Sequence, residues 1–305
     1  MAQTLQYFKA LADDTRLRLL HMLIRYELNV NELIAVLGMG QSRVSRHLKI
    51  LSSAGLLSWR RDGLWVFYAA AAEGEARRFL EAVLPFVAHE AKFQRDLDAA
   101  AGIVEERLRA TRQFFNAIAD DWDQLARDVL GSYDLPGAIS SLVPAEAVAV
   151  DLGCGTGEVM ERMLDIAAEV IGVDGSARML DLARRRFAAE APRVSLRIGD
   201  LEHLPLRDAE ADFVCVNLVL HHLSAPDNVL KEAGRVLKSG GTLVISDFEK
   251  HEDESLRSDY GDRWLGFDPE VMDRFLGEAG FYLAQSFTQP VEKGLVIRFY
   301  QARKN

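Results

Sequence analysis

A glycine-rich segment lies between a β-prone run and a helical stretch, and it reads Asp151-Leu152-Gly153-Cys154-Gly155-Thr156-Gly157. Glycines at these positions let the backbone turn tightly and approach a ligand closely. The spacing does not fit the dinucleotide fingerprint G-x-G-x-x-G, because Glu158 replaces its last glycine and would place a negative charge beside pyrophosphate. An acid two residues before the first glycine can instead accept hydrogen bonds from a cationic amino group, such as that of a methionine-type cofactor.

Polar residues also end the β-prone runs that follow. Asp174 comes 23 positions after Asp151, where a carboxylate can accept hydrogen bonds from both ribose hydroxyls. Asp200 is placed to accept from an adenine amino group while the Leu201 amide donates to the ring, and Asn217 ends the fourth run. Open α/β sheets bind ligands at the carboxyl ends of their strands. The predicted cofactor-binding residues are Asp151, Gly153, Cys154, Gly155, Gly175, Asp174, Met179, Asp200, Leu201 and Asn217.

Two histidines follow the fourth run, at the same predicted edge of the sheet. Either His221 or His222 could accept a proton from an acceptor, so both are catalytic candidates; alternatively the pair orders its loop. Asp247 ends the fifth run and could line the same mouth. Four aromatic residues form either a lid over the acceptor or part of the core: Trp122, Tyr260, Trp264 and Phe267.

The elements that must position these residues alternate between β-prone and helical segments from residue 145 onward. The five β-prone runs are AVAVDLG, EVIGVDG, VSLRIGD, DFVCVNLVL and GTLVISDF. Such alternation predicts a parallel sheet covered by helices on both faces. Two further runs, 281–287 and 295–303, follow a helix over 269–279 and predict a closing hairpin, for seven strands in total.

This ordered series resembles the class I S-adenosylmethionine-dependent methyltransferases over about Phe114 to Arg303. The resemblance implies a Rossmann-like fold that binds S-adenosylmethionine or S-adenosylhomocysteine. It favours an enzyme with an unknown small-molecule acceptor, a quinone among the open choices, but leaves open a non-catalytic domain that senses the cofactor. Arsenite is a poor acceptor because Cys154 lies in the loop and Cys215 inside a strand. DNA bases are poor acceptors because the run from Asn217 lacks the N/D-P-P-aromatic arrangement.

The first seventy residues have a different pattern. Apolar residues over 7–24 predict two helices broken by the turn Asp13-Asp14-Thr15, and Asn29 with Glu32 predicts a capping box at the start of a third helix. A glycine turn then precedes a helix over 41–54 that buries an apolar side. Helix, short turn and polar helix are typical of a helix-turn-helix.

Two β-prone runs after Gly55 are joined by Asp62-Gly63, which predicts a hairpin or wing. The wing would hold phosphates while the preceding helix reads base edges in the major groove of double-stranded operator DNA. The alternative is that these elements only pack, as in other small α+β modules. The predicted DNA-binding residues are Gln41, Ser42, Arg43, Ser45, Arg46, His47, Lys49, Arg60 and Arg61.

The segments FKALADDTRLRLLHML and SRVSRHLKILSSAGLLSWRRDGLWVFY resemble the ArsR/SmtB repressors over residues 1–70. Metal-sensing members of that family carry a cysteine pair in an ELCVCDL-type segment, whereas this chain has Asn29 and Asn31 at the two cysteine positions. The family's second metal site needs a His and carboxylate cluster after the wing, where only His89-Glu90 stands. We therefore expect no metal at the family's positions and none elsewhere.

A long apolar stripe from Phe93 to Ile118 predicts a connecting helix of roughly 35–40 Å. It would pair with its copy in a homodimer, as repressors of this resemblance do, or dock on its own second domain. We predict three parts: residues 1–72 as a winged helix-turn-helix, 73–113 as a helical connector that dimerises, and 114–305 as the cofactor domain.

Charge supports this division of the chain. Residues 1–70 hold nine Lys and Arg against five acids, a net of +4, so the other 235 residues carry a net of −14 within the total of −10. A basic end on an acidic protein fits a DNA-binding module. The start of the chain lacks signal-peptide character and no run is apolar enough for a membrane, so we expect a cytoplasmic regulator, a repressor fused to a methyltransferase-type domain.

Overall fold

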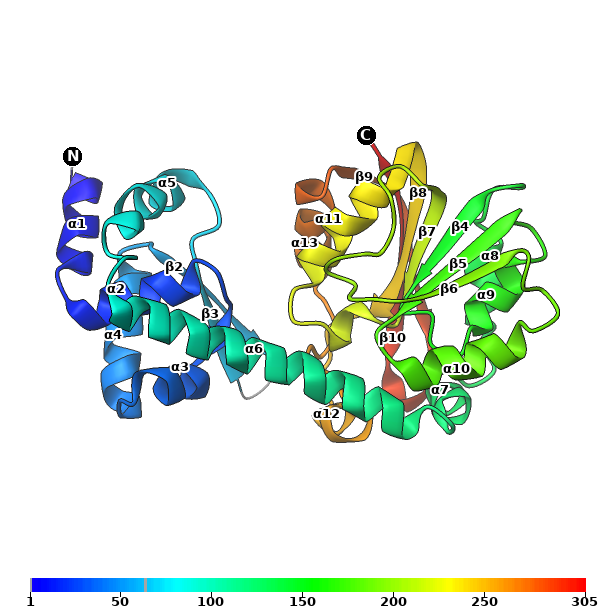
Figure 1. Ribbon diagram of the computed structural model, residues 1–305, viewed down its shortest axis with the longest axis horizontal. Helices are drawn as coiled ribbons and strands as arrows, with labels where there is room; N and C mark the ends of the chain where they lie inside the picture. Colours follow the sequence, from blue (N-terminus) through cyan, green and yellow to red (C-terminus); the bar gives the residue numbers. More distant parts are fainter. Residues whose placement is uncertain (1, 63–64) are drawn as a thin grey trace. The chain divides into compact units, whose positions relative to one another are not determined.

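The computed structural model describes residues 2–62 and 65–305, which form two compact units, Met1–Leu108 and Arg109–Asn305 (Figure 1). Each unit has its own hydrophobic core. The finer division into residues 1–72, 73–113 and 114–305 stays a prediction. Among the described helices, none is both long and apolar enough to cross a membrane.

The first unit is mainly helical with a small antiparallel sheet in the order β1-β3-β2. Its elements are α1 (Ala2–Leu11), α2 (Asp14–Leu23), β1 (Leu28–Asn29), α3 (Val30–Leu37), α4 (Gln41–Ser53), β2 (Leu57–Asp62), β3 (Trp65–Ala70), α5 (Gly74–Val83), η1 (Leu84–Phe86) and the first part of α6 (Ala91–Ile118). The small α+β fold predicted for this end of the chain is confirmed.

The helix-turn-helix is built by local signals in the sequence. Asn29 caps α3 through the amide of Glu32, whose carboxylate accepts in return from the Asn29 amide at 2.8 Å. Gly38 ends α3 in the left-handed region, with φ 64°, where glycine is favoured. Helix α4 then buries Val44, Leu48 and Leu51 completely. Strands β2 and β3 pair antiparallel as predicted, whereas the predicted turn at Gly63 lies outside the described residues.

Ion pairs attach α6 to the helices of the first unit. Arg18 on α2 donates to both carboxylate oxygens of Asp96 at 2.6 and 2.8 Å. Further along α6, Arg107 donates to Glu32 at 2.6 Å, so the capping carboxylate of α3 also binds this helix. These long-range contacts hold residues 91–108 within the first unit.

The second unit contains one seven-stranded sheet in the order β6-β5-β4-β7-β8-β10-β9, in which β10 is antiparallel to both neighbours. Its elements after α6 are α7 (Trp122–Leu130), α8 (Leu135–Ser140), β4 (Val148–Leu152), α9 (Glu158–Met163), β5 (Glu169–Asp174), α10 (Ala177–Arg186), β6 (Val194–Ile198), β7 (Ala211–Asn217), η2 (Leu220–His222), α11 (Pro226–Val236), β8 (Leu237–Phe248), α12 (Ser255–Asp259), α13 (Pro269–Glu278), β9 (Phe281–Pro290), η3 (Glu292–Gly294) and β10 (Val296–Lys304).

Helices cover both faces of this sheet (Figure 1). Successive residues of β4 point to opposite faces, so Ala149 joins a core with α8, α9 and α10 while Val150 joins a core with α11 and α13. The predicted Rossmann-like seven-stranded fold is confirmed. Because β6, β5, β4, β7 and β8 run parallel, their carboxyl ends meet at one edge of the sheet.

Candidate functional site: a cofactor crevice, a histidine cluster and a basic helix

The glycine loop follows β4 at this edge. Gly153 has φ 76°, and a Cβ there would lie 2.4 Å from a methyl group of Val219, which follows β7. Leu218, just before that valine, also has a positive φ of 51°, which is costly for a branched residue. The glycine loop and the strained segment after β7 thus meet at this edge of the sheet, an arrangement that the loop pattern alone did not reveal.

Asp174 at the end of β5 is fixed by backbone donors. One of its carboxylate oxygens accepts from the Gly155 amide at 2.9 Å and the other from the Ser176 amide at 2.7 Å. Burial raises the pKa of Asp174, whereas these amides lower it. The sheet therefore brings the second predicted carboxylate against the glycine loop.

Asp151 is almost completely buried, with 2% of its surface exposed. Its Oδ1 accepts from the Cys215 thiol at 3.3 Å, a weak donor. Burial raises the pKa of Asp151 to about 7; the thiol opposes this rise and the nearby Asp174 adds to it. Burial likewise raises the pKa of the Cys154 and Cys215 thiols.

The other predicted cofactor residues lie on loops or strand ends of the same edge, except Met179, which lies in the first turn of α10. Asn217, the last residue of β7, accepts from the Ser246 hydroxyl at 2.6 Å, and Asp200 accepts from the Glu202 amide at 3.0 Å. Leu201 and Met179 are buried at 7% and 2% exposure. The strand-end residues therefore share one edge of the sheet, while cofactor binding by each predicted residue stays a prediction.

Residues of α6 and α7 cover the loop, and sequence reasoning missed most of them. Asn116 accepts from the Ser176 hydroxyl at 2.7 Å, and Asp123 accepts from the Thr156 hydroxyl at 2.6 Å. The Trp122 ring is the nearest side chain to a Cβ built at Gly155, at 3.7 Å. These residues precede the sheet by many positions, so no local pattern connected them to the loop.

The aromatic lid considered from the sequence is mostly core. Trp264 and Phe267 are 8% and 2% exposed and join the core beneath α11, and Tyr260 joins the opposite core. Only Trp122 lies beside the cofactor loop, where its ring meets Phe115 edge-on.

The predicted histidine pair is part of a larger buried cluster. His221 Nδ1 lies 2.7 Å from Asp247 Oδ1, which also accepts from the Phe248 amide. Burial alone would lower the pKa of His221, but Asp247 and a second carboxylate raise it to about 9. His222 meets the carbonyl of Gly261 at 3.3 Å, and burial together with His221 holds its pKa well below the usual range.

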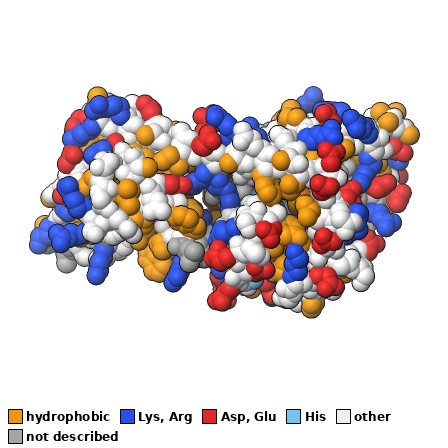
Figure 2. Space-filling model, turned by 90° about the horizontal axis from the view of Figure 1, so that it is seen from below, with side chains coloured by type: hydrophobic (Ala, Val, Ile, Leu, Met, Phe, Trp, Pro, Cys, Tyr) orange, Lys and Arg blue, Asp and Glu red, His pale blue; other side chains and the backbone are white. Residues whose placement is uncertain are grey.

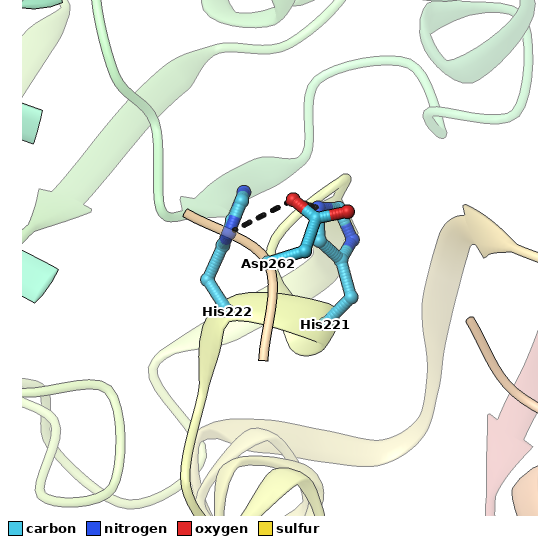
Figure 3. Close-up of side chains that lie close together, drawn as sticks. All are labelled: His221, His222 and Asp262. Atoms are coloured by element: carbon cyan, nitrogen blue, oxygen red, sulfur yellow. Dashed lines mark ion pairs between the residues drawn. The ribbon is translucent and has the colours of Figure 1, made fainter. Parts of the chain in front are cut away.

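That second carboxylate is Asp262, which the sequence analysis did not single out. It lies between the two rings, 3.5 Å from His221 Nε2 and 3.6 Å from His222 Nδ1 (Figure 3). Burial raises the pKa of Asp262 to about 6, and His221 opposes the rise. The three side chains form a group that could hold a metal ion. Asp262 is forty residues from the pair and no motif marks it.

The predicted DNA-binding residues on α4 mostly face outward. The exposed members are Gln41, Ser42, Arg43, Ser45, Arg46 and Lys49. His47 differs, because its side chain is only 13% exposed and its Nδ1 lies 3.6 Å from Asp13. Figure 2 shows basic side chains at several places on the surface of the first unit. Between α1 and α4, a hollow of about 410 Å³ is lined in part by Lys9, Arg46 and Lys49.

The wing residues are held differently. Arg60 donates to both carboxylate oxygens of Glu27 at 2.9 and 2.7 Å, and it lies over the Phe67 ring at 4.4 Å. A phosphate would compete with Glu27 for this guanidinium. Arg61 is exposed.

Comparisons with known proteins agree with both halves of this description. Residues 13–58 match the family model "Bacterial regulatory protein, arsR family", and residues 150–245 match the model "Methyltransferase domain". The second unit is therefore a methyltransferase domain of the S-adenosylmethionine-dependent fold. The chain as a whole combines this domain with an ArsR-family helix-turn-helix.

The relatives are similar over part of their length. An uncharacterised 37.1 kDa protein of transposon TN4556 from Streptomyces fradiae is 35% identical over 50% of this chain and 45% of its own. A demethylmenaquinone methyltransferase of Symbiobacterium thermophilum is 29% identical over 58% of this chain and 73% of its own. A demethylmenaquinone methyltransferase of Lactiplantibacillus plantarum is 40% identical over 33% of this chain and 44% of its own. The chain thus spans less than half the length of two of these three relatives.

Solved structures confirm the fold of the second unit. A SAM-dependent methyltransferase of Aquifex aeolicus superposes with a TM-score of 0.51 at 19% identity, over 62% of this chain and 98% of its own. The cyclase SpnF gives 0.55 at 19% identity, over 63% and 94%. Because one of these similar structures is named a methyltransferase and the other a cyclase, the fold does not determine the reaction, and function must be argued from the site.

Proposed function

We propose that this chain is a DNA-binding transcriptional repressor of the cytoplasm whose second unit binds S-adenosylmethionine and methylates a small molecule. The observation that carries the cofactor proposal is the glycine loop and the buried carboxylates at the carboxyl ends of β4 and β5. There Gly153 and Gly155 have positive φ, and Asp174 accepts from the Gly155 amide. A side chain at Gly153 would collide with Val219, so glycine at this position lets the loop pack directly against the segment after β7.

The residues fit this cofactor. Asp151 would accept hydrogen bonds from its ammonium group, Asp174 from its ribose hydroxyls and Asp200 from its adenine amino group. S-adenosylmethionine, when bound, supplies an electrophilic methyl group. The chain would then orient an acceptor and exclude water, for which Phe115 and Trp122 beside the loop are suited.

The acceptor is proposed by class alone, as a small molecule rather than DNA. Relatives named demethylmenaquinone methyltransferase support a quinone among the possible acceptors. His221 and His222 stay catalytic candidates, because their cluster follows β7 at the same sheet edge and the His222 ring packs edge-on against Phe115 at 4.8 Å.

A second candidate function is cofactor sensing, and α6 favours it. Residues Phe115 and Asn116 of this helix contact the histidine cluster and the segment after β5, whereas Asp96 and Arg107 of the same helix form ion pairs within the first unit. A ligand that orders one part of a helix can alter the other part. The resulting coupling would be reciprocal, typically about 5- to 150-fold in affinity.

For DNA, the exposed polar face of α4 supports binding in the major groove, and we propose a homodimer because operators are read as two half-sites. Arg60, Arg61 and the outward basic residues of α4 would contact phosphates. His47 is the exception, since it turns toward Asp13.

The test is fluorescence anisotropy on DNA from upstream of the gene, together with calorimetry of S-adenosylhomocysteine binding. Arg46→Ala should abolish operator binding and leave cofactor affinity unchanged. Asp174→Ala should weaken cofactor binding about 10- to 100-fold, as expected for lost hydrogen bonds to a charged group, and leave DNA binding in the absence of cofactor unchanged. Loss of both activities in either variant would contradict the two-part proposal.

The same titration separates the two candidates. A change of DNA affinity of about fivefold or more on saturation with S-adenosylhomocysteine supports sensing. Unchanged DNA affinity, with both ligands bound, supports a fused enzyme.

A further inference from the structure

We infer that His221, His222 and Asp262 form a binding site for one divalent transition-metal ion. The inference does not depend on methyl transfer, because it is drawn from the side chains of this cluster alone. This inference departs from the prediction of no metal, which was drawn from the positions of the ArsR/SmtB resemblance in the first unit.

The donor atoms have the spacing that one ion requires. One ligand atom from each of the three residues lies within 4.8 Å of the others. Asp262 Oδ1 is 3.5 Å from His221 Nε2 and 3.6 Å from His222 Nδ1. A tetrahedral ion with bonds of roughly 2.1 Å holds its donors about 3.4 Å apart, so the side chains need only small shifts to close on an ion.

A cation bound at this place would stabilise the buried carboxylate of Asp262. Both of its carboxylate oxygens are buried, and neither has a hydrogen-bond partner among the described residues. Its contacts to the two imidazoles are too long for good hydrogen bonds. A buried carboxylate in this state is strongly unfavourable unless it is paired or coordinates a metal.

The surrounding groups orient the donors toward one point. Asp247 Oδ1 lies 2.7 Å from Nδ1 of His221, so in the neutral ring Nδ1 would donate to Asp247 and Nε2 would offer its lone pair to an ion beside Asp262. This carboxylate–histidine arrangement is the usual support of a metal-bound imidazole. The carbonyl oxygen of Gly261 lies 3.3 Å from His222 Nδ1 and offers a further oxygen ligand.

Charge balance indicates a divalent ion. In a metal-bound site both imidazoles are neutral, so Asp247 and Asp262 contribute two negative charges, which a divalent ion offsets. The charge of Arg257 also reaches Asp262, but Arg257 itself binds Glu254 at 2.9 Å. Two imidazoles and a carboxylate suit zinc, iron, cobalt or nickel better than calcium or magnesium.

Such an ion would connect two segments that are distant in the sequence. His221 and His222 belong to η2, immediately after β7, whereas Asp262 follows α12 in the segment between β8 and α13 (Figure 3). The ion would therefore anchor the 249–268 segment to the edge of the sheet.

The experiment uses the full chain, stripped with EDTA and then dialysed into metal-free buffer. Zn²⁺ alone is titrated against a chromophoric chelator, and Co²⁺ alone is followed by its visible ligand-field absorption. We expect about one ion per chain, Co²⁺ bands of a site with imidazole ligands, and a thermal midpoint that rises with Zn²⁺. Asp262→Asn should weaken Zn²⁺ binding at least 100-fold and abolish both signals. Asp247→Asn, which changes only the support of His221, should weaken it about 10- to 100-fold.

Asp259→Asn is the matched control, because Asp259 is exposed and three residues away; it should behave as the wild type. The metal-free proteins provide a second readout. Asp262→Asn removes a carboxylate that accepts no hydrogen bond from the described residues, so it should leave the melting temperature without metal unchanged, whereas in a purely structural ion-pair network it would lower it. A lower melting temperature, or Zn²⁺ binding by the wild type no tighter than by Asp262→Asn, would overturn the inference. Binding of S-adenosylhomocysteine to the same metal-free samples tests the proposed function separately.

Discussion

Asp96 in the first unit and Asp262 in the second are both 5% exposed, yet their surroundings differ completely. Asp96 accepts from two guanidinium nitrogens of Arg18, so both oxygens are satisfied. Asp262 accepts no hydrogen bond from the described part of the chain. Equally buried carboxylates therefore serve different purposes: Asp96 attaches α6 to α2, whereas Asp262 is the proposed ligand of a metal ion.

Asp151 lies between these extremes. It is 2% exposed and has one partner, the weakly donating Cys215 thiol. Its pKa is raised to about 7 by burial, so near neutral pH the empty crevice holds this carboxyl in both protonation states. The three aspartates thus form a series. Asp96 has two strong donors within the protein, Asp151 has one weak donor and Asp262 has none among the described residues, and we propose external ligands only for Asp151 and Asp262.

The largest effect is expected at the satisfied pair. Asp96→Ala should lower the free energy of unfolding of the first unit by about 3 kcal/mol, because the largely buried guanidinium of Arg18 then loses the carboxylate that pairs with its charge. Urea denaturation followed by far-UV circular dichroism would measure the loss in the transition of that unit. Asp98→Ala is the control on the same helix, and its exposed side chain should change stability by less than about 0.5 kcal/mol. If Asp96→Ala and Asp98→Ala were equally stable, Asp96 would not be a structural ion-pair partner, and its contrast with Asp262 would be wrong.

The next effect is a pH dependence at Asp151. Below about pH 7 the empty site is protonated at this carboxyl, and it must release the proton to accept the ammonium group of the cofactor. Affinity for S-adenosylhomocysteine should therefore be level above pH 7 and fall below it, approaching tenfold per pH unit. Calorimetry at several pH values would measure this slope.

The groups that face Asp151 are Asp174, Cys154 and Cys215. Because burial also raises the pKa of Asp174, Asp151→Asn is needed to isolate the effect. This variant should bind more weakly and lose most of the slope between pH 7 and 6. A slope that persists unchanged would assign the titration to another group.

Local patterns predicted most of the fold. The capping box of Asn29 and Glu32, the glycine after α3 and the alternation of β-prone and helical runs each act within a few residues, and each appears in the structure. The glycine loop and Asp174 were predictable for the same reason, since the carboxyl ends of parallel strands must share an edge.

Contacts between distant segments were not predictable in this way. Asp262 reaches the histidine pair only because the segment after α12 folds back over η2, and Asn116 reaches Ser176 from sixty residues away. The helical position of His47 predicts an outward side chain, yet this side chain is only 13% exposed and lies beside Asp13. Each of these depends on tertiary packing, for which one sequence carries no local signal.

The smallest effect is expected when both members of the Arg18–Asp96 pair are replaced together. Arg18→Met with Asp96→Leu removes both charges and fills the space with apolar atoms, so stability should stay within about 1 kcal/mol of the wild type. The single substitutions supply the other corners of a double-mutant cycle, measured by the same urea denaturation. If the double variant is as unstable as Asp96→Ala, the pair contributes net attraction and not merely mutual satisfaction. In that case the stability lost in Asp96→Ala would come from the missing attraction between Arg18 and Asp96. The cost of leaving a charge without a partner would no longer explain it, and the contrast with Asp262 would have to be drawn from that attraction instead.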